Sequence, residues 1–433
     1  MERGQKFART TFRGYGGGTG RVEHEAVARA ARSSPPSPPT TSPKEPAMST
    51  PTPTPDPTAT APRIAVIGAG PGGLTCARVL QRHGIPVTVY DREAGREARD
   101  QGGTLDLHAD NGQVALKAAG LLDAFLAKAR PEGQEMRTYE AGSGALTGRH
   151  VPEPDEMFKP EIDRGVLRDL LLDSLAPGTV RWGHALAAVE GPAEGPRTLR
   201  FADGTTAVAD LVIGADGAWS KVRRALSGAL PAYSGVTFLE AWFDDVDNRH
   251  PELAALVGQG GAHAADGERA MFAQRNGGDH IRVYLIRRVP ADWLAARGLT
   301  TADTEAIRAL LLEEYADWGP ALRRVLTDND GPYVDRPIHA LPVPHTWTTQ
   351  PTATLLGDAA HLMAPLGVGV NLAMLDAADL ALALATAPTP AEAVTAYEST
   401  MRPRSEEIAA QLHGAATGLL GAGEGLDAHI PQN

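Results

Sequence analysis

A cluster of glycines between two apolar stretches offers the clearest chemistry in this chain. Residues 64–67 form an apolar run, and the segment GAGPGG at 68–73 follows it directly. Gly68 allows a tight turn there, Gly70 lets a phosphate approach the backbone, and Gly73 lets a strand and a helix pack closely. The start of that helix adds free N–H groups and a partial positive charge. The pattern predicts a site for the pyrophosphate of a dinucleotide.

Aspartates follow three further apolar runs. Asp91 comes after the run at 87–90, where a carboxylate can accept hydrogen bonds from a ribose. Asp216 and Gly217 follow the run at 211–213, and Asp358 follows the run at 353–356. A helix cap would also explain Asp216, because aspartate favours that position.

The glycine motif at 68–73 needs a βαβ unit to position it. Residues 74–83 are predicted to form a helix that ends at Gly84, between buried parallel strands at 64–67 and 87–90. The apolar run at 211–213 is expected to return to the same sheet.

Two other parts of the chain have different patterns. Residues from about 236 to 290 alternate apolar and polar side chains, which predicts a mainly antiparallel second sheet. Residues 370–387, and the segment from 391 onward, are Ala/Leu-rich and have a helical pattern.

The composition limits the class of protein. With 433 residues, of which 42% are hydrophobic, the chain can bury one large or two medium cores. No apolar run approaches the roughly 18 residues that a membrane span needs. The formal charge of −12 argues against nucleic acid or an anionic membrane as partner, and a small neutral or hydrophobic substrate fits better.

The only cysteine, Cys76, excludes an intramolecular disulfide and a cysteine-based metal site. We therefore predict a cytoplasmic location and no metal. A monomer or weak homodimer is also expected.

Residues 1–62 differ from the rest of the chain. Between positions 33 and 62 there are 11 prolines, with Ser and Thr in most of the gaps. Such a stretch cannot bury enough apolar surface to offset chain entropy, so it is predicted to be disordered. It also lacks the apolar core of a secretion signal. We expect Met48, which opens a short Pro-Thr linker, to be the true start.

Two more motifs extend the pattern and carry a family resemblance. REARDQGGTLDLHADNGQVALKAAGLL at 96–122 and EIDRGVLRDLLL at 161–172 join the motifs at 67–73, 210–223 and 357–371. With these motifs, the chain resembles the flavoprotein aromatic hydroxylases of the para-hydroxybenzoate hydroxylase type over most of its length. Within that group it resembles the tetracycline-degrading monooxygenases. The resemblance implies FAD as cofactor and NADPH or NADH as an electron donor that docks without a Rossmann domain of its own.

The resemblance also implies which residues near the N-terminal motif hold the FAD. Asp91 and Arg92 would hold the adenosine end. Arg99 would lie near the path of the nicotinamide donor and Asp106 beside the flavin. Arg164 would reach the FAD from the start of a helix.

The two later motifs would complete the cofactor site. The resemblance places Asp216 and Gly217 in contact with both the flavin and the donor, and lets Asp358 bind the ribityl hydroxyls. The residues expected to open a helix whose N-terminal amides face the flavin pyrimidine are Gly367, Gly369 and Asn371. Amides at that helix start would stabilise negative charge on the reduced ring. His361 belongs to the family's structural signature, which favours a structural role over that of a base.

The sequence departs from the family at positions that bear on the substrate. Pro365-Leu366-Gly367 is one residue shorter than the usual spacing, and Leu366 replaces a common aromatic residue. An ungapped alignment through Phe272 puts Gly261 and Arg282 where the tetracycline enzymes carry an arginine and a histidine. The substrate residues we predict are Phe272, Arg282 and Pro365, and tetracycline itself is not the expected substrate.

The predicted fold is α/β: a discontinuous Rossmann-like FAD-binding domain, a mainly antiparallel β-sheet substrate domain, and C-terminal helices. The boundaries are 63–121, 150–223 and 335–375 for the FAD-binding domain, 122–149 and 224–334 for the substrate domain, and 376–433 for the helical segment.

The predicted function is that of a monooxygenase, which hydroxylates an aromatic or polycyclic small molecule with O2 through a flavin hydroperoxide. No catalytic side chain is assigned, because the cofactor carries the hard chemistry. The alternatives are a flavin-dependent reductase or halogenase, and a flavin-bound sensor without turnover. The WxWxIP segment usual in halogenases does not occur in the chain.

A chain that starts at Met48 or at Ala61 is expected to keep its flavin and its thermal stability, because the Pro-rich tail has no apolar pattern with which to dock. Thermal unfolding and the flavin absorbance of the shortened proteins measure this. A drop of many degrees in melting temperature would contradict it.

Overall fold

The computed structural model of the chain describes residues 61–98, 102–267 and 269–419. The predicted disordered tail therefore lies outside the described residues, apart from its last two positions, and so does the end of the predicted C-terminal segment.

A five-stranded parallel sheet carries the glycine motif. Its strands run in the order β17 (Ala353–Leu355), β11 (Leu211–Gly214), β1 (Ile64–Ile67), β2 (Val87–Tyr90) and β7 (Val180–Arg181). All residues of β1 and β11 are buried, as their continuous apolar runs predict for strands covered on both faces. The return of 211–213 to the first sheet is confirmed.

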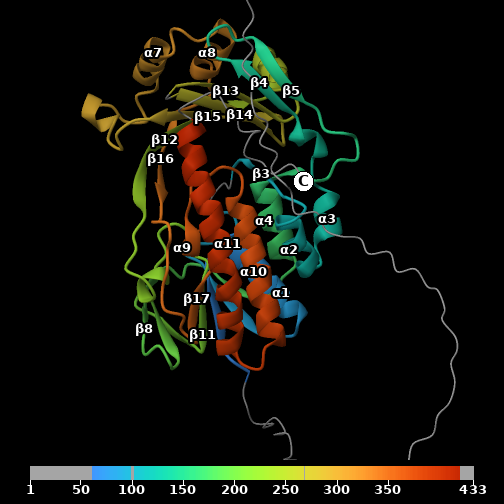
Figure 1. The fold of residues 1–433 in the computed structure, drawn as a ribbon, viewed down its shortest axis with the longest axis vertical. Helices are drawn as coiled ribbons and strands as arrows, with labels where there is room; N and C mark the ends of the chain where they lie inside the picture. The colour runs from blue at the N-terminus through green and yellow to red at the C-terminus, as the bar shows by residue number, and fades with distance from the viewer. Residues whose placement is uncertain (1–60, 99–101, 268, 420–433) are drawn as a thin grey trace, which may run out of the picture. The chain divides into compact units, whose positions relative to one another are not determined.

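Helices from distant parts of the sequence pack together against this sheet (Figure 1). They are α1 (Pro71–Arg82), α2 (Gly112–Ala119), α3 (Leu122–Leu126), α4 (Arg164–Asp173), α10 (Gly369–Thr386) and α11 (Pro390–Leu419). Helix α1 begins at Pro71, three residues before the predicted start, because the fixed φ of proline suits the first position of a helix.

Helix α10 corrects one expectation. Its 18 residues are long and apolar enough to cross a membrane by length and composition, and it is the single such helix in the part of the chain that the structure describes. The core helix of a soluble protein passes the same test. Here α10 packs against α1, α2 and α11.

A seven-stranded sheet forms the second layer and is antiparallel except where β13 meets β4. Its order is β16 (Val334–Ala340), β12 (Ala232–Asp244), β15 (His280–Arg288), β14 (Arg269–Asn276), β13 (Gly261–Asp266), β4 (Met136–Glu140) and β5 (Leu146–His150). The antiparallel second sheet predicted for about 236–290 is confirmed. The smaller sheets are β8 (Leu186–Glu190) with β9 (Arg197–Phe201) and β10 (Thr206–Ala209), and the ribbon of β3 (Thr104–Asp106) with β6 (Glu161–Asp163).

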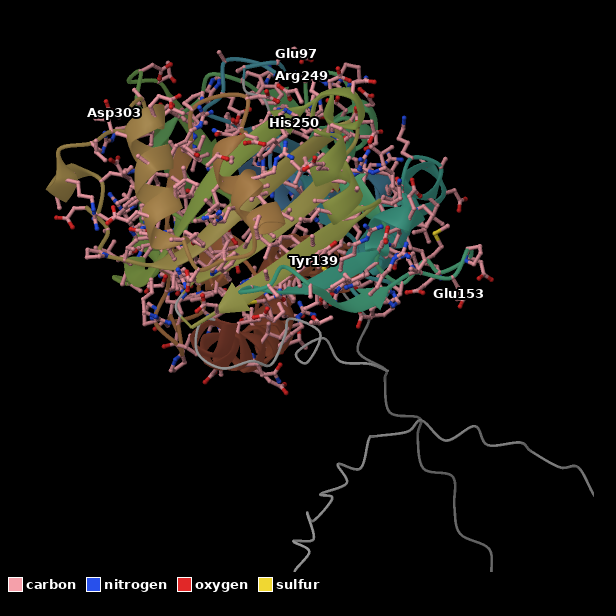
Figure 2. The ribbon with its side chains drawn as sticks, turned by 90° about the horizontal axis from the view of Figure 1, so that it is seen from above. Glu97, Tyr139, Glu153, Arg249, His250 and Asp303 are labelled. Carbon is pink, nitrogen blue, oxygen red and sulfur yellow. The ribbon has the colours of Figure 1, made fainter. Side chains whose placement is uncertain are left out.

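Helices α7 (Thr304–Glu314) and α8 (Pro320–Thr327) cover one face of the large sheet (Figure 1). Figure 2 looks onto this end and labels Asp303, the N-cap of α7, and Arg249 and His250, which follow β12. His250 Nε2 lies 2.9 Å from Asp330 Oδ2, so a hydrogen bond ties this end of the sheet. The remaining short elements are α5 (Val246–Arg249), α6 (Pro251–Val257), α9 (Asp358–His361), η1 (Pro131–Gln134), η2 (Arg223–Ala225) and η3 (Ala295–Arg297).

The buried apolar side chains form two main cores, one around the parallel sheet and one between the large sheet and α7 and α8. Phe125 of α3 belongs to the first core, whereas β4 and β5 belong to the large sheet. The predicted domain boundaries themselves stay a prediction. The face of the large sheet opposite α7 and α8 meets the ribbon of β3 and β6, where Gln274 of β14 donates a hydrogen bond to Glu161 of β6.

Candidate active site

The glycine loop between β1 and α1 has the geometry of a phosphate site. Gly68 has a φ of +110°, and a Cβ there would lie 2.3 Å from the carbonyl oxygen of Ala215. A Cβ on Gly73 would lie 2.0 Å from the carbonyl oxygen of Gly68, whereas a Cβ on Gly70 would meet no atom within 4 Å. Close packing therefore leaves no room for a side chain at Gly68 or Gly73, whereas Gly70 faces open space. Helix α1 begins there without a side-chain cap or an acidic residue in its first turn.

Asp91 lies beside this loop. Its Oδ2 accepts a hydrogen bond from the backbone N–H of Ala69 at 2.6 Å, and its Oδ1 accepts one from that of Glu93 at 2.8 Å. These bonds fix the carboxylate, and each oxygen keeps a lone pair for a ribose hydroxyl. Arg92 is exposed next to it, and Arg99 lies outside the described residues.

The second motif is held by its own side chains. Asp216 accepts hydrogen bonds from the Ser220 hydroxyl at 2.5 Å and from the backbone N–H of Lys221 at 2.6 Å, so it caps the turn that follows β11. The helix cap predicted for Asp216 is wrong, because the short helix η2 that follows has Val222 as its N-cap and no side-chain cap hydrogen bond. Asp216 instead holds the turn before that helix, and a flavin contact remains a prediction. Gly217, with φ +75°, faces open space.

Arg223 connects the second motif to the third. Its guanidinium is buried and donates from Nη1 to the carbonyl oxygen of Ala359 at 2.9 Å and from Nη2 to that of Ala218 at 2.6 Å. The sequence motif contains this arginine, but its role depends on a contact more than 130 positions away, which the motif alone does not reveal.

Asp358 and Arg164 mark a recess between the motifs. Both side chains are reached by water, yet desolvation by surrounding protein raises the pKa of Asp358 and lowers that of Arg164. Each side chain has exposed surface, yet enough protein surrounds it to remove part of its hydration. Such side chains line a concave surface, and we call the one between Asp358 and Arg164 the recess. The groups whose charges act on Arg164 come from both layers and include Asp358, Tyr284, Arg282 and Arg336.

The loop before α10 forms another wall. Gly367 has φ +87°, and a Cβ on Gly369 would meet no atom within 4 Å. Asn371 is buried; its Oδ1 accepts from the backbone N–H of His108 at 2.8 Å, and its Nδ2 donates to the carbonyl oxygen of Asp106 at 2.8 Å. Asn371 thus fixes the start of α10 to the segment after β3, while the open backbone at Gly369 remains available to a ligand.

His361 supports the third motif from behind. Its Nε2 lies 2.6 Å from Asp376 Oδ2, which also accepts the backbone N–H of Gly357 at 3.0 Å, and Asp376 Oδ1 accepts from Arg404 Nη2 at 2.8 Å. Burial lowers the pKa of His361, but the charge of Asp376 outweighs it and raises the pKa overall. The structural role predicted for His361 fits this buried network.

The inner face of the large sheet offers aromatic side chains to the recess. Phe272 is paired with Tyr284 across β14 and β15, and their rings stack at 6.4 Å between centroids. Phe238 on β12 meets the same tyrosine edge-on at 6.1 Å. Pro365 is exposed in the loop before α10.

Arg282 lies at the edge of this aromatic group and is already engaged. Its guanidinium stacks over the Trp242 ring at 4.6 Å and lies 3.8 Å from the Glu240 carboxylate. A Cβ on Gly102 would lie 2.3 Å from Arg282 Nη2, so the side chain also packs against the segment before β3. The structure thus brings Arg282 to the predicted surface, but with its charge partly neutralised.

The residues of the recess fit an FAD. An open glycine loop at a helix start suits a pyrophosphate, Asp91 suits a ribose, and the recess between Asp358 and Arg164 suits a polar chain and ring. A Cβ at Gly70 or Gly369 would meet no protein atom, which leaves room for the cofactor at both ends.

Comparison with known proteins agrees with this geometry. The family described as "FAD binding domain" matches residues 62–317 and 346–411. Monooxygenase penA of Penicillium thymicola is 31% identical over 80% of this chain and 92% of that protein. The 3-amino-4-hydroxybenzoate 2-monooxygenase of Streptomyces cremeus is 32% identical over 80% of this chain and 84% of that protein.

Solved structures share the fold. HpxO of Klebsiella pneumoniae, solved with FAD and uric acid, superposes with a TM-score of 0.69 at 21% identity, over 84% of this chain and 91% of that one. The tetracycline destructase Tet(55) superposes with a TM-score of 0.65 at 21% identity, over 83% and 90%. On its family match and on the arrangement of its glycine loop, Asp91 and Asp358, this chain belongs to the FAD binding domain family and is an FAD-dependent monooxygenase.

Proposed function

We infer that the enzyme uses NAD(P)H and O2 to hydroxylate an aromatic or polycyclic small molecule that lies against the inner face of the large sheet. The observation that carries this proposal is the group of three rings, Phe238, Phe272 and Tyr284, beside the recess marked by Arg164. Aromatic side chains favour a flat apolar ligand through offset or edge-on ring contacts. The name of one relative supports the substrate class, since it acts on 3-amino-4-hydroxybenzoate.

The chain's own residues would bind and orient the partners. The N–H groups at the start of α1 would hold the pyrophosphate, Asp91 the ribose, and the recess at Asp358 and Arg164 the ribityl chain. FAD, when bound, supplies the hydride acceptor and the site of oxygen activation. The sheet and the loop before α10 would exclude water and hold the substrate close.

Several finer points belong to the proposal. The electron donor docks transiently, since the sequence carries one dinucleotide fingerprint. The enzyme is a monomer or weak homodimer, located in the cytoplasm, and it binds neither nucleic acid nor membrane. No observation favours a reductase, a halogenase or a sensor over the monooxygenase; NAD(P)H oxidation that an aromatic compound stimulates would separate these classes.

Tetracycline is expected to be a poor substrate. Gly261 offers no side chain, and Arg282 is engaged by Glu240 and Trp242, so neither supplies a free polar ligand. We expect tetracycline at best to stimulate NAD(P)H oxidation weakly and to release hydrogen peroxide as the main product. The measurement is the ratio of oxygenated tetracycline formed to NADPH consumed under air.

The competing expectation is that Arg282, a long cation, leaves Glu240 and holds the ligand by charge and hydrogen bonds. A ratio of oxygenated tetracycline formed to NADPH consumed near one would support this competing expectation. An Arg282→Gln variant provides the control, because it should abolish any tetracycline turnover that depends on this charge and leave the peroxide background in place.

A further inference from the structure

Two carboxyl groups face each other where the ribbon of β3 and β6 meets the recess. The antiparallel register sets Asp106 directly opposite Glu161. Residues in that relation point to the same face of the ribbon, with Cβ atoms about 4.5–5.5 Å apart. Glu161 is 6% exposed. Two negative charges so close, one of them buried, repel each other, and a proton on one of them removes the repulsion.

Among the residues that the structure describes, the charges around the pair do not include a dedicated cation. Arg130 faces the same ribbon surface, but its Nη1 lies 2.8 Å from Asp163 Oδ1, which takes up its charge. From β14 of the large sheet, Gln274 reaches across and donates from Nε2 to Glu161 Oε1 at 3.0 Å. The Gln274 hydrogen bond and the charge of Arg130 lower the pKa of Glu161, but burial and the charge of Asp106 outweigh them.

His108 is the other titratable group at the pair. Its Nε2 lies 3.1 Å from Asp106 Oδ2. The Asp106 side chain is 24% exposed, so solvent reaches this member of the pair.

Hydrogen bonds at Thr104 fit a protonated Glu161. The Thr104 hydroxyl lies 2.6 Å from Glu161 Oε2 and 3.1 Å from the carbonyl oxygen of Ile162, and it accepts from Arg130 Nη2 at 3.1 Å. A hydroxyl has one hydrogen to donate and can accept two bonds. If Glu161 is protonated and donates to the hydroxyl, the hydroxyl donates to Ile162 and all three contacts are hydrogen bonds. If Glu161 is ionised, the Ile162 contact loses its hydrogen.

Electrostatics agree with this geometry. Burial raises the pKa of Glu161 to about 8, and the negative charge of Asp106 adds to the effect. Asp106 is the member that faces the site, because its Oδ2 lies 3.7 Å from the position of a Cβ on Gly367, in the loop before α10.

We propose that Asp106 and Glu161 hold one proton between them and that this pair supplies the proton that each turnover takes up. The inference rests on the monooxygenase activity. A turnover joins NAD(P)H, a proton, O2 and the substrate, and yields NAD(P)+, the hydroxylated substrate and water. The proton passes from the pair to the oxygen atom that leaves as water, and the pair regains a proton from solvent through Asp106. Glu161 acts through Asp106, so it is a positioning residue that stores the proton.

The first test measures unfolding in urea against pH for the wild type and Glu161→Gln, an isosteric variant that cannot ionise. The folded-state pKa of Glu161 is raised, so its contribution to stability is complete below the unfolded pKa of about 4.3 and is lost as the pH rises to about 8. Relative to Glu161→Gln, the folding equilibrium constant of the wild type should fall by up to about tenfold per pH unit across this window. Parallel pH curves for the two proteins would overturn the proposal.

The second test measures O2 consumption by the FAD-loaded enzyme with NADPH alone, from acidic to alkaline pH. Without a substrate the same proton appears in hydrogen peroxide, so no ligand has to be known. We expect the wild-type rate to fall above the pKa of the pair, and the Glu161→Gln rate to be lower by at least about tenfold at neutral pH and independent of pH in that range. Glu161→Asp keeps the acid and should keep the pH-dependent fall.

Glu190→Gln makes the same chemical change on an exposed strand residue paired with Arg200 and should match the wild type in both tests. The proposal would be overturned if the pH profile of O2 consumption by Glu161→Gln were identical to that of the wild type. It would also be overturned if the unfolding test showed a proton on Glu161 but Glu161→Gln left the rate of O2 consumption unchanged. A wild-type enzyme that binds FAD but oxidises no NADPH would contradict the monooxygenase activity instead, and the unfolding test would still decide whether Glu161 holds a proton.

Discussion

Gly70→Val is expected to produce a folded protein that does not retain FAD. The backbone at Gly70 has φ −81° and ψ 176°, which valine adopts readily, and a Cβ there would meet no protein atom within 4 Å. The branched side chain instead fills the space that the pyrophosphate needs. Loss of two charge-assisted hydrogen bonds to phosphate at roughly 1.5–3 kcal/mol each corresponds to a hundredfold or weaker affinity. The measurement is the FAD released by heat per mole of purified protein, together with a thermal melt of the apoprotein.

Gly73→Ala is the matched control. Its Cβ would lie 2.0 Å from the carbonyl oxygen of Gly68, a backbone atom that cannot move aside alone. This variant should lower the melting temperature of the apoprotein, whereas Gly70→Val should not. Full FAD occupancy in Gly70→Val would mean that the glycine loop does not face the pyrophosphate.

Asp376→Asn is expected to lower the free energy of unfolding by about 3–5 kcal/mol, because it leaves the buried His361 and the partly buried Arg404 without their carboxylate partner. Asp376 is 1% exposed and binds His361 at 2.6 Å and Arg404 at 2.8 Å. It also accepts the backbone N–H of Gly357, so the variant should loosen the segment that presents Asp358 and weaken FAD binding. Urea unfolding and FAD titration measure the two effects.

The stability effect should depend on pH with a definite sign. The pKa of His361 is raised by Asp376, so its contribution is complete below its unfolded value of about 6.5 and is lost as the pH rises through the folded value. Although burial raises it, the pKa of Asp376 is lowered overall by His361, so that contribution is complete above about 3.9 and is lost as the pH falls. The difference between wild type and Asp376→Asn should therefore be largest between these limits. Asp379→Asn, on the same helix and also paired with Arg404, is the control and should cost much less because Asp379 is partly exposed. An equal loss in the two variants would contradict the buried network.

Local geometry explains which parts of the site could be predicted from the sequence. The roles of Gly68, Gly70 and Gly73 follow from how one turn joins one strand to one helix, and the structure gives each of them the expected surroundings. The parallel sheet and the antiparallel sheet were also predictable, because strand burial on one or both faces leaves its period in the sequence.

Features that depend on distant contacts could not be predicted in this way. Glu161 meets Asp106 only through the register of two short strands about 55 residues apart, and Gln274 joins them from a third strand. Asn371 was predicted to open a helix whose N-terminal amides face the flavin, and this stays a prediction. The hydrogen bonds of its side chain to the segment at 106–108 join distant parts of the chain, so no local pattern reveals them. The family resemblance of the motif at 161–172 pointed to Arg164, whereas Glu161 at the start of the same motif carries no signal of its burial.

The central claim is that this enzyme inserts one atom of O2 into an aromatic substrate at the expense of NAD(P)H. The most direct measurement is turnover of the FAD-loaded enzyme under 18O2 with NADPH and a panel of hydroxylated aromatic and polycyclic compounds, with mass spectrometry of the products. We predict that at least one compound stimulates NADPH oxidation and gains one 18O atom per NADPH consumed. If an FAD-loaded enzyme oxidised NADPH with no compound gaining 18O, or if products gained oxygen only from water, the assignment as a monooxygenase would be contradicted.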